Sequence, residues 1–155
     1  MITYIDVQVK EHAQKLLALQ IPSYRVEAKL IGFDGIPPLH DTTESLQGCG
    51  ETFFVYELEG QLAGAISYER DGDEVTICRM MVHPDYFRRG IAGKLLRHVQ
   101  EVEARTQRFL VSTGSANEPA LALYGRDGFQ VTSEREVAPG IWLTFLAKVT
   151  PFLGR

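Results

Sequence analysis

The residues best suited to chemistry stand together at the start of one predicted helix. In the run Arg88-Arg89-Gly90-Ile91-Ala92-Gly93, two arginines precede small residues. The first N–H groups of a helix have no partner within it, and the helix dipole places partial positive charge there. Glycine and alanine let an anion approach the backbone closely. The run therefore predicts a phosphate or pyrophosphate site, and the alternative interpretation is a tight turn with solvated arginines.

This run differs from two common phosphate-binding motifs. A Walker loop needs Gly-Lys followed by serine or threonine, whose hydroxyl binds magnesium, but Gly93-Lys94 is followed by Leu95. The dinucleotide motif needs a glycine two residues before Gly90, where Arg88 stands. The sequence therefore disfavours ATPase, kinase and NAD-binding functions.

A strand and a helix must position this loop. The apolar run over residues 75–82 predicts a strand, and Pro84, which lacks a backbone N–H, follows its end. Over residues 90–106, apolar residues recur at helical spacing, namely Ile91, Leu95, Val99 and Val102. We expect this helix to lie on a sheet and to turn its polar positions to water.

The segment before the sheet is expected to be mainly helical. A short strand over residues 1–7 precedes two predicted helices, over residues 11–19 and 21–31, with Pro22 opening the second and Gly32 capping it. The next loop places Phe33, Ile36 and Leu39 among glycines and prolines. Apolar side chains in such a loop need cover, so we expect a pocket wall here. A further short helix, with Thr42 or Asp41 as its cap, should end at Gly48.

The remaining chain reads as strands around two helices. Strands are predicted over residues 52–59, 61–70, 75–82, 109–113, 129–136 and 141–149. The first three should form an antiparallel meander, and the helix that follows should make the strand over 109–113 parallel to that over 75–82. Asn117-Glu118-Pro119 should open a short helix that Gly128 ends, with Tyr124 inside it.

Two motifs in these elements resemble the GCN5-related N-acetyltransferase (GNAT) family. Its pyrophosphate signature, Gln/Arg-x-x-Gly-x-Gly/Ala after Val-x-Pro, corresponds to residues 87–92, which follow Val82-His83-Pro84; Phe87 departs from the pattern at the first position. A second signature, Asn-x-x-Ala-x-x-Leu/Phe-Tyr-x-x-x-Gly-Phe, is filled by Asn117, Ala120, Leu123, Tyr124, Gly128 and Phe129. With the order of elements, the resemblance covers residues 51–148.

The resemblance implies a fold, a reaction and the site at which the reaction takes place. The fold is α+β, a mostly antiparallel mixed sheet of about seven strands with helices on both faces, in one domain over residues 1–155. The reaction is direct transfer of acetyl from acetyl-coenzyme A, without metal, to a primary amine of a small molecule or a protein. The site is a V-shaped opening between the strand that ends at Val82 and the fifth strand.

Coenzyme contacts follow from the same resemblance. They are expected from Met80, Met81, Val82, Arg88, Arg89, Gly90, Ile91, Ala92, Gly93, Lys94 and Asn117. The strand residues would pair their backbone with the pantetheine arm. Asn117 is an equally good helix cap. Tyr124 is expected to be the general acid for the leaving thiolate, against the alternative that it only packs with Leu121 and Phe129.

The acceptor side is less defined. Tyr24, Glu27 and Phe33 are expected to contact the acceptor. An alkylammonium must lose a proton before its nitrogen can attack the thioester, so the reaction needs a general base. Several family members use a glutamate as this base, but the corresponding position in this sequence is Thr76. Candidates for the base are Glu27, Asp34, Glu44 and Glu51.

Composition narrows the class of partner. The 155 residues carry a net charge of -4 without a basic tail, which argues against nucleic acid. No apolar run has the length of a membrane span and no signal peptide is evident, so we expect a cytoplasmic protein without membrane contact. The two cysteines, Cys49 and Cys78, lack metal-binding spacing. A homodimer is compatible with the sequence.

Rival functions are a non-catalytic coenzyme A binding or sensing domain and a nucleotide-phosphate transferase.

Overall fold

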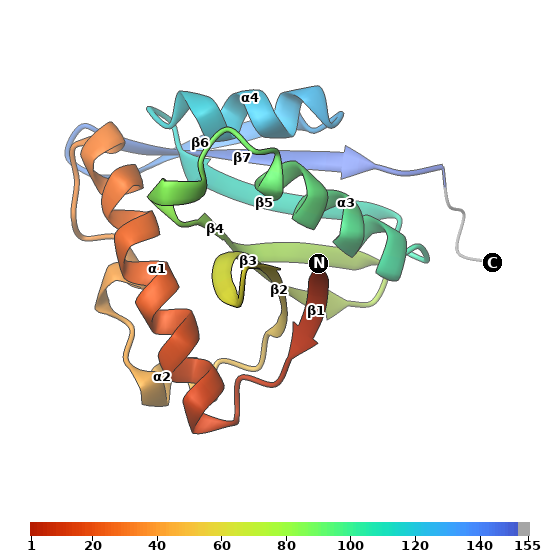
Figure 1. The fold of residues 1–155 in the computed structure, drawn as a ribbon. Helices are drawn as coiled ribbons and strands as arrows, with labels where there is room; N and C mark the ends of the chain where they lie inside the picture. The colour runs from red at the N-terminus through yellow and green to blue at the C-terminus, as the bar shows by residue number, and fades with distance from the viewer. Residues whose placement is uncertain (152–155) are drawn as a thin grey trace.

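The computed structural model describes residues 1–151, which form one mixed sheet flanked by helices (Figure 1). In chain order the elements are β1 (Ile2–Ile5), α1 (Lys10–Ile31), η1 (Pro37–His40), α2 (Thr43–Gln47), β2 (Thr52–Leu58), β3 (Gln61–Asp71), β4 (Glu74–Val82), η2 (Pro84–Tyr86), α3 (Ile91–Val102), β5 (Arg108–Gly114), α4 (Glu118–Arg126), β6 (Gln130–Ala138) and β7 (Ile141–Val149).

The sheet has seven strands in the order β1-β2-β3-β4-β5-β7-β6. Neighbouring strands are antiparallel except β4 and β5, which are parallel. The helix α3 makes the crossover that a parallel pair requires. The predicted meander, parallel pair and closing hairpin are therefore confirmed.

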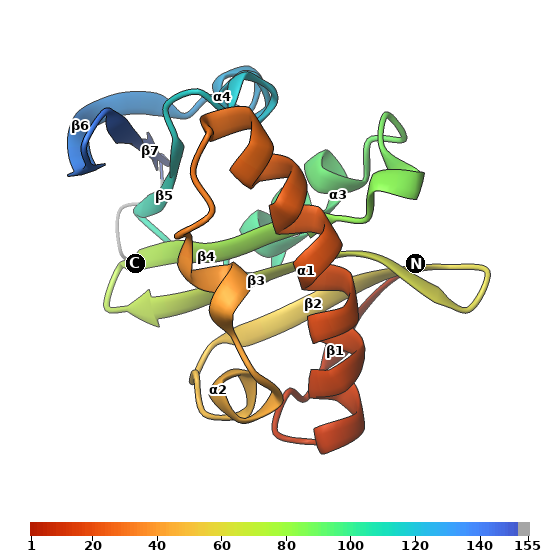
Figure 2. The same ribbon diagram turned by 90° about the vertical axis from the view of Figure 1, so that its left-hand side faces the viewer.

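Helices cover both faces of the sheet, as predicted. On one face α3 and α4 bury a core with β3, β4 and β5, in which Leu95, Val99 and Phe109 lie. On the other face α1 and α2 pack against β2, β3 and β4 around Leu16, Leu46 and a second core cluster. Figure 2 shows α1 in front of the sheet and α3 behind it.

The pairing between β4 and β5 stops halfway along both strands. Only three residue pairs are in register, from Glu74 opposite Arg108 to Thr76 opposite Leu110. Beyond them β4 stays paired with β3, and β5 stays paired with β7 as far as Gly114. The two strands therefore diverge into an opening in the middle of the sheet, which confirms the predicted V shape.

The helix α1 is continuous, so the prediction of two separate helices was wrong. Pro22 lies inside it and cannot donate to the carbonyl of Ala18. Buried residues occur on both sides of the proline, including Leu19 and Tyr24, and all pack into the same core. This shared burial outweighs the one missing hydrogen bond, and Gly32 caps the helix in a left-handed conformation as expected.

A glycine in β3 sets the position of α3. A Cβ atom at Gly64 would lie 2.8 Å from Cγ2 of Ile91 and 3.0 Å from the carbonyl oxygen of Met81. The first turn of α3 therefore rests directly on the sheet beside β4. This contact fixes the start of the helix at the mouth of the opening.

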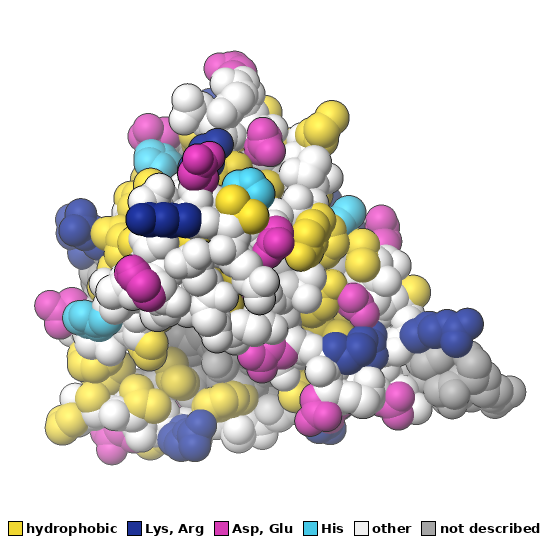
Figure 3. Space-filling model, turned by 90° about the horizontal axis from the view of Figure 1, so that it is seen from below, with side chains coloured by type: hydrophobic (Ala, Val, Ile, Leu, Met, Phe, Trp, Pro, Cys, Tyr) yellow, Lys and Arg dark blue, Asp and Glu magenta, His cyan; other side chains and the backbone are white. Residues whose placement is uncertain are grey.

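The surface carries charges of both signs. On the face seen in Figure 3, lysine and arginine side chains are scattered among acidic and apolar ones, without one gathered basic patch. None of the helices in residues 1–151 combines the length and the apolar character that a membrane span requires.

Candidate active site

Two cavities occupy the opening between β4 and β5. The loop cavity, about 530 Å³, is lined by residues 86–93 together with parts of α1 and α4. The inner cavity, about 410 Å³, is lined by α1, β4, β5 and the residues around η1. Both volumes are typical of small-molecule sites. The two cavities share the lining residues Glu27, Met80, Asn117, Ala120 and Leu123, and so meet at one point.

The loop cavity contains the predicted anion site. Gly90 caps α3 with a positive φ of 74°, a conformation that glycine adopts without strain. The first helical hydrogen bond runs from the Lys94 N–H to the Gly90 carbonyl, so the N–H groups of residues 91–93 have no partner within the helix. Arg88 also has a positive φ, 65°, which is uncommon for a residue with a side chain. The loop is therefore held in the shape that presents its N–H groups to the cavity.

Alternate residues of β4 turn their backbone toward the opening. The N–H of Met80 donates to the Tyr24 hydroxyl and the N–H of Val82 donates to the Ser23 hydroxyl, both at 3.2 Å. On the opposite edge, the N–H of His83 donates to the carbonyl of Ala63 in the sheet. The two outward donors are thus satisfied by hydroxyl groups of α1 rather than by a strand.

Two of the expected coenzyme contacts lie elsewhere. Met81 lies between Met80 and Val82, and alternate residues of a strand point to opposite faces of the sheet. Met81 pairs with Ala65 of β3 and is only 1% exposed, in the core cluster under α1. Lys94 lies outside the lining of both cavities, and its ammonium group sits 5.6 Å from the centre of the Tyr56 ring. Neither Met81 nor Lys94 is among the residues that line the two cavities.

Tyr124 lines the inner cavity from α4. Its ring is 3% exposed and packs edge-on against Phe129, with the ring centres 5.6 Å apart. Its hydroxyl has no hydrogen-bond partner among residues 1–151. Burial, together with the nearby charge of Glu27, raises the pKa of Tyr124 well above its usual value. The side chain is therefore a neutral phenol at physiological pH, and none of residues 1–151 accepts its proton in a hydrogen bond.

Glu27 projects from α1 to the point where the cavities meet. Its Oε1 accepts hydrogen bonds from Asn117 Nδ2 at 2.9 Å and from the Thr113 hydroxyl at 3.5 Å. Burial raises the pKa of Glu27, and these two hydrogen bonds partly oppose the rise. Asn117 also caps α4, because its Oδ1 accepts the Ala120 N–H. The capping role of Asn117 is thus present in the structure, and its amide also holds Glu27.

The apolar wall of the inner cavity differs from the prediction. Tyr24 and Ile36 line the cavity, but Phe33 and Leu39 do not. The Phe33 ring covers Gly35, where a Cβ atom would fall 2.4 Å from the nearest ring carbon, and it packs against the core under α1. The loop folds back on itself at Gly35, which turns Phe33 away and brings Ile36 in.

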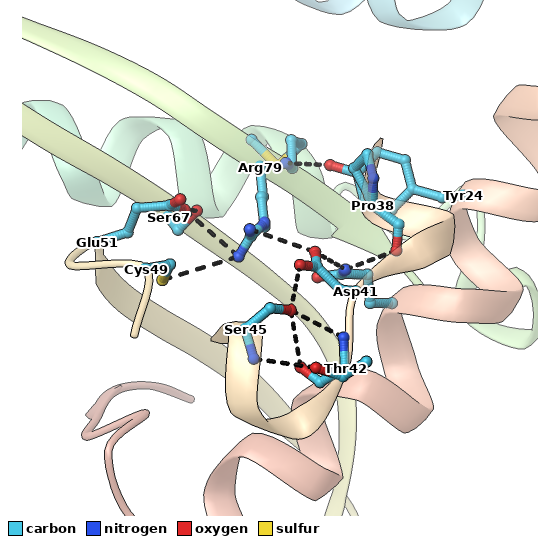
Figure 4. Close-up of polar contacts among 11 residues, drawn as sticks. Tyr24, Pro38, Asp41, Thr42, Ser45, Cys49, Glu51, Ser67 and Arg79 are labelled. Carbon is cyan, nitrogen blue, oxygen red and sulfur yellow. Dashed lines mark hydrogen bonds and ion pairs between the residues drawn. The ribbon is translucent and has the colours of Figure 1, made fainter. Parts of the chain in front are cut away.

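An ion-pair cluster that the sequence analysis missed lines part of the inner cavity (Figure 4). Arg79 of β4 lies 3.3 Å from a carboxylate oxygen of Asp41 and 3.5 Å from one of Glu51. Glu51 also accepts a hydrogen bond from the Ser67 hydroxyl at 2.6 Å. A charged residue inside an otherwise apolar strand was the only sequence signal for this cluster.

Three possible metal ligands lie close together near this cluster. Side-chain atoms of Glu51, Glu69 and Cys78 fall within 4.8 Å of one another. Burial, and next to it the charge of Glu51, raises the pKa of the Cys78 thiol to about 12. Of these three residues, Glu51 is already engaged by Arg79 and the Ser67 hydroxyl.

A further cavity, about 590 Å³, lies elsewhere on the molecule. Its lining includes His12 and Lys15 of α1, Glu57 of β2, residues of the edge strand β1, and His83. Its lining contains neither the loop at the start of α3 nor any residue of β4 or β5.

Comparison with known proteins agrees with this geometry. Residues 49–131 match the family model described as an acetyltransferase (GNAT) domain. The chain is 40% identical over 144 residues to UPF0157 protein YqkA of Bacillus subtilis (strain 168); the match covers 93% of this chain and 42% of that protein. The chain therefore belongs to the GNAT acetyltransferase family and spans less than half the length of this relative.

Solved structures show the same fold. The ribosomal-protein-S18-alanine N-acetyltransferase of Escherichia coli superposes with a TM-score of 0.75 at 21% identity, covering 96% of this chain and 94% of that one. The PaiA N-acetyltransferase of Thermoplasma acidophilum, in complex with coenzyme A, gives 0.77 at 14% identity, covering 97% and 99%. At these identities the likeness concerns the fold.

Two buried tyrosines beside the site offer a matched test of its hydrogen bonding. Tyr24→Phe should lower the free energy of unfolding by about 1 kcal/mol, because the Met80 N–H loses its acceptor. Tyr124→Phe should change it by much less, since that hydroxyl bonds to no residue that the structure describes. Urea unfolding of both variants measures the difference. Equal losses would contradict the assignment of the Tyr24 hydroxyl to β4.

Proposed function

We propose that this protein transfers acetyl from acetyl-coenzyme A to a primary amine of a small molecule or a protein. The observation that carries the proposal is the meeting of two cavities at Glu27, Met80 and Asn117, with Tyr124 in the wall beside them. One cavity suits a phosphate-bearing donor and the other suits a cationic acceptor. A group transferred between them would pass through that point.

The loop cavity fits coenzyme A in its chemistry. The free N–H groups of residues 91–93 and the side chains of Arg88 and Arg89 suit a pyrophosphate. The Met80 and Val82 donors suit amide carbonyls of an extended pantetheine arm, which would take the places now filled by the Ser23 and Tyr24 hydroxyls. Exchange of one acceptor for another keeps these donors satisfied.

The inner cavity fits an amine. Three carboxylates line it, those of Glu27, Asp41 and Glu51, against the single guanidinium of Arg79. Arg79 is already paired with two of them, so the net charge left in the cavity is negative. An alkylammonium is attracted by such a wall, whereas an alcohol gains little and an anion is repelled.

The chain supplies a proton donor for the leaving group. The free amine attacks the thioester carbonyl carbon, a carbon–nitrogen bond forms, and the carbon–sulfur bond breaks. The departing thiolate then takes a proton from Tyr124, whose phenol is protonated at neutral pH. The phenolate left on Tyr124 regains a proton from solvent, which in turn takes up the proton that the nitrogen loses as the amide forms.

The loop assignment is tested by adding a side chain to it. Gly90→Val should weaken acetyl-coenzyme A binding by about tenfold or more, because a β-branched residue resists the left-handed conformation that presents the N–H groups. Gly140→Val is the control, since Gly140 has a φ of 75°, equally open surroundings and a place in the hairpin between β6 and β7. Calorimetric titration measures both. Equal affinity of the two variants would refute the loop assignment.

The proton donor is tested by removing one hydroxyl. Tyr124→Phe should leave coenzyme affinity and stability nearly unchanged and lower kcat by about 10²-fold, as the loss of a general acid does. Thiol release during a screen of primary amines measures the rate, and single-turnover rates separate chemistry from product release. Coenzyme binding without turnover on any amine would favour the coenzyme-sensing alternative.

A further inference from the structure

We propose that Glu27 is the general base that removes the proton from the acceptor amine. The inference rests on the proposed function and adds to it the residue at which the acceptor is activated. Three observations support it: the position of Glu27 between the two cavities, the absence of a hydrogen bond to its Oε2 within residues 1–151, and the contacts of the other candidate carboxylates.

The position of Glu27 is the first argument. It is one of the few residues that line both cavities, and it comes from α1, which crosses the opening between β4 and β5. Its charge raises the pKa of two tyrosines, Tyr24 and Tyr124, so the carboxylate lies close to the proposed acid. A base and an acid on either side of one transfer point are what acetyl transfer requires.

The hydrogen bonds of Glu27 leave one oxygen available. Asn117 and Thr113 both donate to Oε1, and this fixes the orientation of the carboxylate. Oε2 has no hydrogen-bond partner among the residues that the structure describes. An ammonium group in the inner cavity can therefore donate to Oε2 without displacing an existing contact.

The other candidate carboxylates are placed differently. Asp34 and Glu44 are exposed and line neither cavity. Glu51 pairs with Arg79 and accepts the Ser67 hydroxyl, so its carboxylate is already engaged by other residues. Thr76, at the position where family members carry a glutamate, has no titratable group.

Two protons leave the acceptor nitrogen: Glu27 takes the first, and the second, lost as the amide forms, balances the proton that Tyr124 gives to the thiolate. An N–H bond of the ammonium breaks and its proton moves to Oε2, which leaves the lone pair on nitrogen to form the bond to the carbonyl carbon. Because burial raises the pKa of Glu27, its carboxylate accepts this proton more readily than a solvated one. The protonated carboxyl then returns the proton to solvent through the cavity.

The same burial has a cost for stability. The folded chain binds the Glu27 proton more tightly than the unfolded chain, so stability falls as the pH rises from the unfolded to the folded pKa, and the cost persists above it. Tyr24 and Tyr124, the titratable groups whose pKa Glu27 raises, stay neutral in this range because burial raises their pKa further. Glu27→Gln should therefore match or exceed the wild type in stability at pH 8.

The test compares two acceptors that differ in basicity. The probes are the alkylamine that the wild type acetylates fastest and its 2,2-difluoro analogue, assayed at about pH 8.5, where the analogue is mostly unprotonated and the alkylamine mostly protonated. Glu27→Gln should lower kcat/KM about 10²-fold for the alkylamine and less than about tenfold for the analogue, because the analogue needs no base. Coenzyme affinity should not change. The exposed carboxylate Glu44, replaced by glutamine, serves as the control.

Two results would overturn the proposal. Equal losses with both amines would make Glu27 a positioning residue, and no loss with either would remove it from the reaction. A wild type that binds the coenzyme but acetylates no amine fails the proposed function itself, so the two failures are distinguishable.

Discussion

The structure depends on one interruption in backbone pairing. After Thr76 and Leu110, the parallel strands β4 and β5 share no further pairs, although both continue for several residues. Backbone donors exposed by such a divergence must find partners, since a buried, unpaired N–H is costly. Hydroxyl groups from α1 meet this need at Met80 and Val82. The opening is thus stable without a ligand and yet presents donors that a ligand can take over.

The helix α1 therefore does more than cover the sheet. It supplies the acceptors for β4, part of the apolar wall and the carboxylate of Glu27, all from its second half. Its passage across the opening explains why it is not broken at Pro22. A break there would leave Ser23 and Tyr24 without a fixed relation to β4.

Charge separates the two ends of the opening. Three arginines, Arg88, Arg89 and Arg126, line the loop cavity beside a helix start, whereas carboxylates outnumber the one arginine in the inner cavity. The ion pairs of Arg79 join the connection between α1 and β2 to β4 in the wall of the inner cavity. Each end therefore favours a different charge, as a reaction between an anionic donor and a cationic acceptor requires.

The sequence predicted the elements that depend on local pattern. Strand alternation, helical periodicity and the glycines near Gly90 located the sheet, α3 and the loop, because these signals arise within a few residues. The errors concern relations between distant segments. Phe33 was placed by its composition, but the fold of its loop turns it inward. Met81 was grouped with its neighbours, although alternation directs its backbone to β3. The Arg79 cluster joins three segments and has no local signal.

Amide hydrogen exchange resolved by residue, with and without coenzyme A, tests the central claim most directly. If the diverging strands and the start of α3 form the coenzyme site, the amides of residues 91–93 should exchange more slowly in its presence. The exchange rates of the Met80 and Val82 amides should also change when coenzyme A is added, while those of amides around His12 and Lys15 should not. Protection around His12 and Lys15, with none at residues 91–93, would contradict the account.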